Sequence, residues 1–235
     1  MANFMDFSSD RANIFLMLID KSGSMEDDEI KVREGIKMYR KSFENFSEAN
    51  SIAVSICKFD TSFYERPFES ITNFSFDYSA AGGTALYYAI VKSAEHLKKY
   101  IQEVVETKGI VPRVTFIVFS DGEPCNDRMD RSDAVKAIAE LNYSGVTTVF
   151  VAFGSAINSS FGEKMGFMST IDVENREVLV NFLGVELSKS CKEQSKSMKS
   201  LGANFFSKAI GKTKSEGFSQ TTQQALEDTS WIDDI

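Results

Sequence analysis

Short apolar runs alternate with longer amphipathic stretches along the first two thirds of the chain. Residues 14–19 (IFLMLI) are continuously apolar, too few for a helix, and followed by a polar turn, which indicates a strand buried on both faces. Residues 28–46 instead place apolar side chains at roughly helical intervals among charged ones, which predicts an amphipathic helix. Its predicted apolar stripe consists of Ile30, Ile36, Met38, Phe43 and Phe46.

The same two patterns recur as far as residue 154. Further strands are predicted at 51–59, 114–119 and 146–154, and further helices at 85–105 and 132–141. Ser132 is the expected N-cap of the last of these helices. Between them, residues 63–78 contain Pro67 and many aromatic residues, which favours an irregular or edge strand. Three of these aromatics are expected to fill the core rather than to face a partner: Phe74, Phe76 and Tyr78.

This order of elements predicts an α/β fold of the doubly wound, Rossmann-like class. Strands that alternate with helices require crossover connections, which give a mostly parallel central sheet with helices on both faces. A chain of 235 residues favours one domain with a single large core. We expect an N-terminal extension at 1–11, the α/β domain at 12–200 and a tail at 201–235. The closing helix of the domain is expected at 177–200, with a weak point at Gly184.

Composition and charge exclude several classes of function. The chain is 43% hydrophobic and 26% charged, which is typical of a soluble globular protein. A formal net charge of -8 argues against binding to nucleic acid or to anionic lipid. Three separated cysteines without a CxxC pair predict neither a zinc site nor a disulfide framework. With no signal peptide and no apolar run of membrane-spanning length, we expect a cytoplasmic protein.

Three short polar segments stand where the predicted strands and helices meet. The first strand leads into Asp20-Lys21-Ser22-Gly23-Ser24, and the strand at 114–119 leads into Ser120-Asp121-Gly122-Glu123. The third segment, Gly82-Gly83-Thr84, comes immediately before the second helix. Ligands of open α/β sheets collect in the crevice outside the carboxyl ends of the strands, so these three segments are expected to converge.

The three segments offer oxygen donors and neither histidine nor thiolate among the candidate ligands. This donor set suits a hard divalent cation, with Mg²⁺ as the first choice and Mn²⁺ or Ca²⁺ as alternatives. Mg²⁺ commonly keeps several water molecules, so two aspartates and three hydroxyl groups leave coordination positions open. Gly23, Gly82 and Gly83 would allow the backbone to approach the ion closely.

These segments resemble the signature of von Willebrand factor A (vWA) domains. IDKSGS is similar to the DxSxS motif of that family, GGTAL to its glycine-threonine loop and VFSDGEP to its aspartate-bearing third loop. Together such loops form the metal-ion-dependent adhesion site (MIDAS), and the resemblance covers roughly residues 12–190. It implies hydroxyl ligands from Ser22, Ser24 and Thr84, with Asp20 and Asp121 acting directly or through water. It also implies an open position that accepts an acidic side chain of a protein partner.

Simpler interpretations exist for the same residues. Asp20 and Ser24 could cap a helix, and the segment 121–123 could be an ordinary polar turn. His96, the only histidine, is expected on a helix flank rather than in a catalytic site. Cys125 lies near the proposed site in sequence, but it has no evident base and is expected to be inert.

The sequence therefore predicts a non-enzymatic, cation-dependent protein-binding module. Intracellular bacterial proteins of this general type often act beside kinases, phosphatases or ATPases, including those linked to tellurite resistance and stress responses, and the resemblance suggests such a partner here. One alternative is a metal-assisted phosphohydrolase, although the chain lacks a P-loop and a DxD motif at Asp20. Another alternative is a scaffold protein that docks through its tail, residues 202–235.

Overall fold

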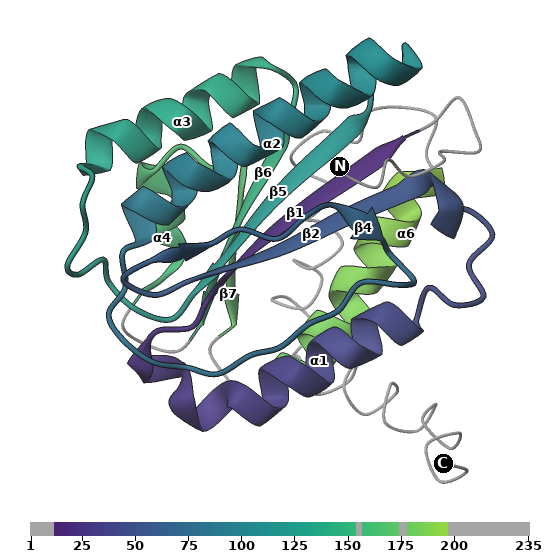
Figure 1. The fold of residues 1–235 in the computed structure, drawn as a ribbon. Coiled ribbons are helices and arrows are strands. Elements are labelled where there is room, and N and C mark those ends of the chain that lie inside the picture. The colour runs from purple at the N-terminus through teal and green to yellow at the C-terminus, as the bar shows by residue number, and fades with distance from the viewer. Residues whose placement is uncertain (1–11, 154–156, 174–177, 197–235) are drawn as a thin grey trace, which may run out of the picture.

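A largely parallel sheet forms the centre of the molecule. The computed structural model describes residues 12–153, 157–173 and 178–196 (Figure 1). The strand order is β3-β2-β1-β5-β6-β7, and β4 also pairs with β2. The parallel strands are β1 (Asn13–Asp20), β2 (Ile52–Phe59), β5 (Arg113–Ser120), β6 (Thr147–Phe153) and β7 (Ser169–Val173).

The segment predicted as an irregular edge forms two very short strands. β3 (Phe63–Tyr64) and β4 (Glu69–Ser70) both run antiparallel to β2. Pro67 lies between them, where it interrupts no ladder. The aromatic residues that follow face inward, because Phe74 and Tyr78 are buried and Phe76 packs against the same core.

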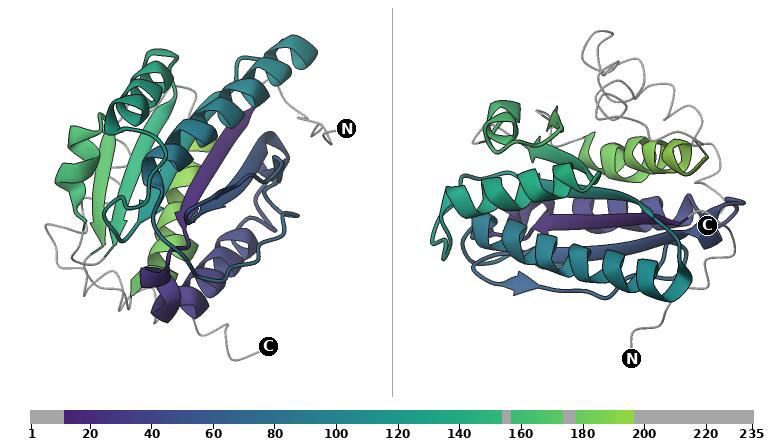
Figure 2. Two further views of the ribbon diagram at one scale, coloured as in Figure 1. Left: turned by 60° about the vertical axis from the view of Figure 1, so that its left-hand side comes forward. Right: turned by 90° about the horizontal axis from the view of Figure 1, so that it is seen from above.

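Helices cover both faces of the sheet, so the doubly wound class predicted from the sequence is confirmed. Figure 2 (right) shows α2 and α3 on one side of the sheet and α6 on the other. The first face carries α2 (Leu86–Lys108), α3 (Arg131–Tyr143) and α4 (Ser159–Lys164). The second carries α1 (Glu29–Lys41), α5 (Leu179–Asn181), the π-helix η4 (Phe182–Glu186) and α6 (Leu187–Lys196). Two 3₁₀ turns, η1 (Gly23–Asp28) and η2 (Ala49–Ser51), precede α1 and β2.

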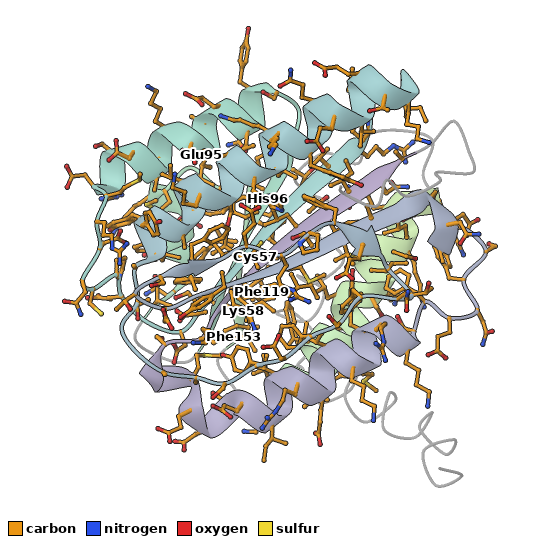
Figure 3. All side chains as sticks on the ribbon, viewed as in Figure 1. Cys57, Lys58, Glu95, His96, Phe119 and Phe153 are labelled. Atoms are coloured by element: carbon orange, nitrogen blue, oxygen red, sulfur yellow. The ribbon has the colours of Figure 1, made fainter. Side chains whose placement is uncertain are left out.

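Successive residues of the central strands supply two separate cores, one on each face of the sheet, where a single large core was expected. On β1, Phe15 and Met17 face α1 and η4, whereas Leu16 and Leu18 face α2 and α3. This alternation follows from the pleat of a strand that is buried on both faces. On the α1 side, Phe119 of β5 stacks on Phe153 of β6 with ring centroids 5.8 Å apart (Figure 3). The two cores hold the carboxyl ends of β1 and β5 in fixed positions.

Helix α1 is shorter than predicted, and one member of its expected stripe is wrong. The chain first forms η1, so α1 begins at Glu29 and ends at Lys41. Ile36 and Phe43 are buried as expected, but the Ile30 side chain is 64% exposed. Ile30 lies in the first turn of the shortened helix, on the side that faces solvent. Phe46 packs against the core from a turn beyond the helix end.

The predicted N-cap of α3 is also wrong. Asp130, not Ser132, occupies the N-cap, and it forms a capping box with Asp133. In such a box each of the two side chains satisfies a backbone N–H group of the first turn. An N-cap aspartate with an acidic residue three positions later outcompetes the serine two positions further on.

The last part of the domain contains elements that the sequence patterns did not indicate. Helix α4 and strand β7 were missed entirely. The closing helix is present, but it is interrupted by η4, which contains Gly184. A Cβ atom at Gly184 would lie 2.4 Å from Met38 Sδ, so glycine lets α1 and η4 pack closely. The expected extension at 1–11 and the tail at 201–235 lie outside the described residues, as do 174–177 and 197–200 of the closing-helix region.

No helix among the described residues is both long enough and apolar enough to cross a membrane.

Candidate metal centre

The three predicted loops meet at the point where the strand order reverses. The chain passes from β1 to β2 on one side and then crosses back to β5 on the other side of β1. A crevice forms at such a switch point, outside the carboxyl ends of the strands. Asp20 is the last residue of β1, Asp121 follows the last residue of β5, and Thr84 lies just before α2. The fold therefore delivers all three loops to one edge of the sheet.

Asp20 is the most enclosed side chain of this site. Its Oδ1 accepts a hydrogen bond of 2.8 Å from the Ser22 backbone N–H, and its Oδ2 accepts one of 2.6 Å from Ser120 Oγ. The Tyr78 hydroxyl donates to the Asp20 carbonyl oxygen at 2.5 Å. The side chain is fully buried. These contacts fix both the backbone and the carboxylate of Asp20 at the end of β1.

The hydroxyl groups of the first loop connect it directly to the third loop. Ser22 Oγ lies 3.0 Å from Ser24 Oγ, and Ser24 Oγ donates to Asp121 Oδ1 at 2.7 Å. Ser22 and Asp121 are buried, whereas Ser24 is exposed. Ser24 therefore links two buried residues, Ser22 and Asp121, at the protein surface.

Thr84 completes the group from the second loop. A Cβ atom built on Gly122 would lie 3.6 Å from Thr84 Oγ1 and 3.7 Å from Ser24 Oγ, so both hydroxyls border the same small space. Gly122 leaves that space open because it has no side chain. The predicted convergence is therefore observed for all five residues, Asp20, Ser22, Ser24, Thr84 and Asp121. Their role as metal ligands stays a prediction.

The site places two buried carboxylates, Asp20 and Asp121, close together. Burial raises the pKa of Asp20 to about 6, hydrogen bonds from Ser120 and Ser22 oppose the shift, and the nearby Asp121 adds to it. Within the described residues no lysine or arginine forms an ion pair with Asp20. A bound cation would supply the missing positive charge.

The donor set fits a hard divalent cation. Mg²⁺ binds oxygens at about 2.1 Å in octahedral geometry, so neighbouring ligand oxygens stand about 3 Å apart. The separations of 3.0 Å between Ser22 Oγ and Ser24 Oγ and of 2.7 Å between Ser24 Oγ and Asp121 Oδ1 are of that size. The described part of the chain contains no group of three or more His, Cys, Asp or Glu side chains suited to a metal. Hydroxyl oxygens would therefore have to share the coordination with the two aspartates.

Backbone hydrogen bonds hold the first and second loops together. Gly23 N–H donates to the Gly82 carbonyl at 3.0 Å, and Ala81 N–H donates to the Lys21 carbonyl at 2.7 Å. Gly82 has a φ of +81°, a conformation that glycine adopts without the strain a side chain would cause. The glycine loop thus packs directly against the DxSxS loop and places Thr84 beside it.

A partly buried ion pair supports the first loop from behind. Lys21 Nζ lies 2.7 Å from Asp60 Oδ2, which also accepts a hydrogen bond of 2.9 Å from Tyr64. Burial alone would raise the pKa of Asp60, but hydrogen bonds from Lys21, Ser62 N–H and Tyr64 and the charge of Lys21 lower it. Because Lys21 points to Asp60, its ammonium group does not neutralise the proposed ligands.

The third loop carries a contact that sequence reasoning missed. Asp127 accepts hydrogen bonds from the backbone N–H groups of Tyr87, at 2.6 Å, and Tyr88, at 2.9 Å. It therefore caps the N-terminus of α2 across forty residues of sequence. Nearby, Cys125 Sγ accepts a hydrogen bond of 3.3 Å from Thr84 N–H. The third loop and the Thr84 loop thus act as one unit.

The simpler interpretations account for only part of this geometry. Ser22, rather than Asp20 or Ser24, is the N-cap of η1, and its side chain makes no capping hydrogen bond. Glu123 is exposed and is a solvated turn residue. His96, labelled in Figure 3, lies on α2. Its ring stacks on that of Phe68, with centroids 5.0 Å apart. Helix capping therefore does not explain why five oxygen-bearing residues converge.

Comparison with solved structures identifies the architecture. The pilus adhesin SpaC from Lactobacillus rhamnosus GG aligns with 79% of this chain at a TM-score of 0.62 and 12% sequence identity. The fold is that of a vWA domain. The aligned region covers only 31% of the SpaC chain, and the two proteins are similar in fold alone.

Two further structures with the vWA fold also align with this chain. Manganese-loaded TRAP protein from Plasmodium vivax aligns with 74% of this chain and 72% of its own, at a TM-score of 0.51 and 14% identity. Proximal thread matrix protein 1 from the mussel byssus, with a zinc-occupied MIDAS motif, aligns with 77% of this chain and 46% of its own, at 0.53 and 13%. Comparison of the sequence with protein-family models finds no match, and comparison with curated proteins finds none either.

Proposed function

We propose that this chain is a protein-binding module that works through a divalent cation held by Asp20, Ser22, Ser24, Thr84 and Asp121. The observation that carries the proposal is the continuous row of oxygens from buried Asp121 to exposed Ser24, beside the buried carboxylate of Asp20. Three neutral hydroxyls and two carboxylates would leave a bound dication with unused coordination capacity. A carboxylate from a partner protein suits that capacity.

The choice of ion follows from the donors. Oxygen ligands alone favour Mg²⁺, with Mn²⁺ and Ca²⁺ as alternatives. Support also comes from the vWA-fold structures, one loaded with manganese and one with zinc in its MIDAS motif. In this chain Asp20 and Asp121 would provide the charge, the hydroxyls would fill neutral positions, and Ser120 and Tyr78 would hold Asp20 in place.

A binding role is favoured over catalysis by what surrounds the site. Lys21, the nearest lysine in sequence, is held by Asp60, and His96 lies on α2 against Phe68. A metal-assisted phosphohydrolase would benefit from such a group as a general base or acid. Cys125 is exposed next to Thr84, but a thiol needs a nearby base or cation to become an effective nucleophile.

The partner is proposed by its chemistry. A protein that presents aspartate or glutamate would complete the coordination of the ion. We favour a cytoplasmic kinase, phosphatase or ATPase of a bacterial stress-response or tellurite-resistance system as the class of partner. Scaffolding through the tail at 202–235 is the competing role. Loss of partner binding in Asp20→Asn, with the tail intact, would separate the two.

The proposal is tested with Mn²⁺ as the ion and acetate as the smallest carboxylate. Mn²⁺ bound to chelator-stripped protein enhances the relaxation of water protons, and acetate should reduce that enhancement by displacing coordinated water. Acetamide, the neutral counterpart, should have little effect, and Asp20→Asn should show no enhancement. The proposal would be overturned by a folded wild-type protein that binds no Mn²⁺. It would also be overturned if saturating acetate left the relaxation enhancement of bound Mn²⁺ unchanged.

A further inference from the structure

A groove lies between α1 and the last helices of the domain, at the opposite end of α1 from the candidate metal centre. It encloses about 640 Å³ and runs between the C-terminal end of α1 and the segment formed by η4 and α6. Figure 1 shows α6 beside the end of α1 that is remote from η1. Met38 and Val185 contribute apolar lining, and no residue of the proposed metal centre lines the groove.

Lysines dominate the charge of this groove. Its lining includes two glutamates, Glu44 and Glu193. Four lysines also line it: Lys41, Lys189, Lys192 and Lys196. Such an excess of positive charge is unusual on a chain with a formal net charge of -8. The groove therefore favours an occupant that is acidic as well as apolar.

Two of these lysines are positioned by aromatic rings rather than by carboxylates. Lys192 Nζ lies 5.1 Å from the ring centroid of Phe43 and 5.8 Å from that of Phe46, and Lys196 Nζ lies 5.3 Å from Phe46. Neither ammonium forms an ion pair with a carboxylate inside the described ranges. Partial burial lowers the pKa of Lys192, and the neighbouring Lys196 lowers it further. An anion placed between the two ammonium groups would relieve this repulsion.

The chain itself carries a segment with the complementary chemistry. Residues 226–235 (LEDTSWIDDI) contain no lysine or arginine and include the only tryptophan of the protein, Trp231. Their acidic residues are Glu227, Asp228, Asp233 and Asp234, and their large apolar residues are Leu226, Trp231, Ile232 and Ile235. This short stretch thus combines four acidic and four large apolar side chains, which suits a lysine-rimmed apolar groove.

The connection is long enough for this segment to return to the domain. Lys196 lines the groove and is the last described residue before the tail. The connection between Lys196 and Leu226 comprises residues 197–225, which is enough chain to span on the order of 30 Å. Tethering at this distance gives a local concentration of about a millimolar or more, so modest affinity suffices.

We propose that residues 226–235 dock in the groove between α1 and α6 of the same chain, with acidic side chains at Lys192 and Lys196 and Trp231 against the apolar floor. This interaction is independent of the metal centre. The tail then has its binding site on its own domain. In the alternative scaffold role the tail would bind another protein, and the groove would not be its site.

Trp231 reports directly on the proposal, because it is the only tryptophan in the chain. In the 235-residue chain its emission should be blue-shifted, and acrylamide should quench it less than it quenches the isolated peptide 226–235. Lys192→Glu/Lys196→Glu should return both properties to those of the peptide. Lys136→Glu reverses one charge at an exposed position of α3, outside the groove, and should change neither property. Raising the salt concentration should weaken the shielding as well.

A charge exchange between the groove and the tail distinguishes loss of docking from misfolding of the groove variant. Asp233→Lys/Asp234→Lys alters only the tail and should also expose Trp231, whereas combining it with Lys192→Glu/Lys196→Glu should restore the shielding. Trp231 that is as accessible in wild type as in the peptide would overturn the proposal. So would shielding that both charge-reversed variants retain. Shielding that disappears on dilution would assign the segment to a second copy and overturn the intramolecular form.

Discussion

Ser120 Oγ donates a hydrogen bond of 2.6 Å to Asp20 Oδ2, which joins the carboxyl ends of β5 and β1 inside the sheet edge. The bond fixes one carboxylate oxygen, while Ser22 N–H fixes the other at 2.8 Å. Asp20 therefore cannot relax away from the neighbouring Asp121 when no cation is present. If the site binds a cation as proposed, this arrangement would favour ion binding at the expense of stability in the metal-free protein.

The first prediction concerns Asp20→Asn. Asparagine keeps the size of the side chain and can keep the bond from Ser22, but it removes a buried charge. We expect the chelated variant to melt at or above the temperature of the chelated wild type. Adding Mg²⁺ should stabilise the wild type, by about 2.7 kcal/mol at a concentration one hundred times its Kd, and should not stabilise the variant.

Thermal melts of both proteins, with chelator and with Mg²⁺, check this prediction. Calorimetric titration of the same samples provides an independent measure of ion binding. A variant that still responds to Mg²⁺ would exclude Asp20 as a contributor to the site. If the chelated variant melts far below the chelated wild type, Asp20 stabilises the fold in the absence of metal.

A second prediction concerns the ion pair behind the first loop. Asp60→Asn leaves Lys21, whose side chain is mostly buried, without its carboxylate, so we expect a loss of about 3 kcal/mol in the free energy of unfolding at neutral pH. The pKa of Asp60 is lowered in the folded protein. Its stabilisation is therefore complete above the unfolded value of 3.8 and is lost as the pH falls through the lower folded pKa.

Urea unfolding from neutral pH down to below pH 4 measures this effect. The difference between wild type and Asp60→Asn should shrink at the acid end of the range. Glu140→Gln breaks the exposed pair of Glu140 with Lys98 and is the matched control, for which we expect little change at neutral pH. A constant difference between wild type and Asp60→Asn at every pH would contradict an electrostatic origin.

A third prediction separates helix capping from loop positioning. Asp127→Ala removes the cap of α2 and should cost about 1 kcal/mol of stability. Because Asp127 also ties the third loop to the helix that follows Thr84, the substitution should weaken Mg²⁺ binding. Asp130→Ala removes the N-cap of α3 and should cost a similar amount without changing ion affinity.

Chemical unfolding and calorimetric titration of these two variants show whether Asp127 acts only as a helix cap or also positions the third loop. Equal losses of ion affinity in both would mean that general destabilisation is responsible. Unchanged affinity in Asp127→Ala would show that the third loop keeps its position without this bond.

The site could be predicted from the sequence because its residues directly follow recognisable local patterns. Asp20 and Asp121 come at the ends of uniformly apolar runs, and Thr84 follows two glycines just before a helix, so the fold class alone placed them at one edge. The supporting contacts are different in kind. Tyr78 reaches Asp20 across 58 positions and Asp127 reaches Tyr87 across 40, and no periodicity encodes such pairings.

The missed elements have a similar explanation. Strand β7 is a short edge strand in which Thr170 and Asp172 are only partly buried, so it lacks the continuous apolar run that marks β1 and β5. The exposure of Ile30 depends on η1, which delays the start of α1. Spacing along the sequence cannot reveal where a helix begins when its first turn is replaced by a 3₁₀ turn.

The fourth prediction addresses the packing of α1 against η4. A Cβ atom at Gly184 would lie 2.4 Å from Met38 Sδ, 2.7 Å from its Cγ and 2.8 Å from its Cβ, so Gly184→Ala should overpack this interface. We expect a loss of about 1–3 kcal/mol in the free energy of unfolding, although alanine has the higher intrinsic helix propensity. In a Met38→Ala background the Sδ and Cγ contacts are gone, so Gly184→Ala should cost less there. A double-mutant cycle measured by urea unfolding gives the coupling, and purely additive effects would mean that Gly184 is required by the backbone of the π-helix and not by its contact with Met38.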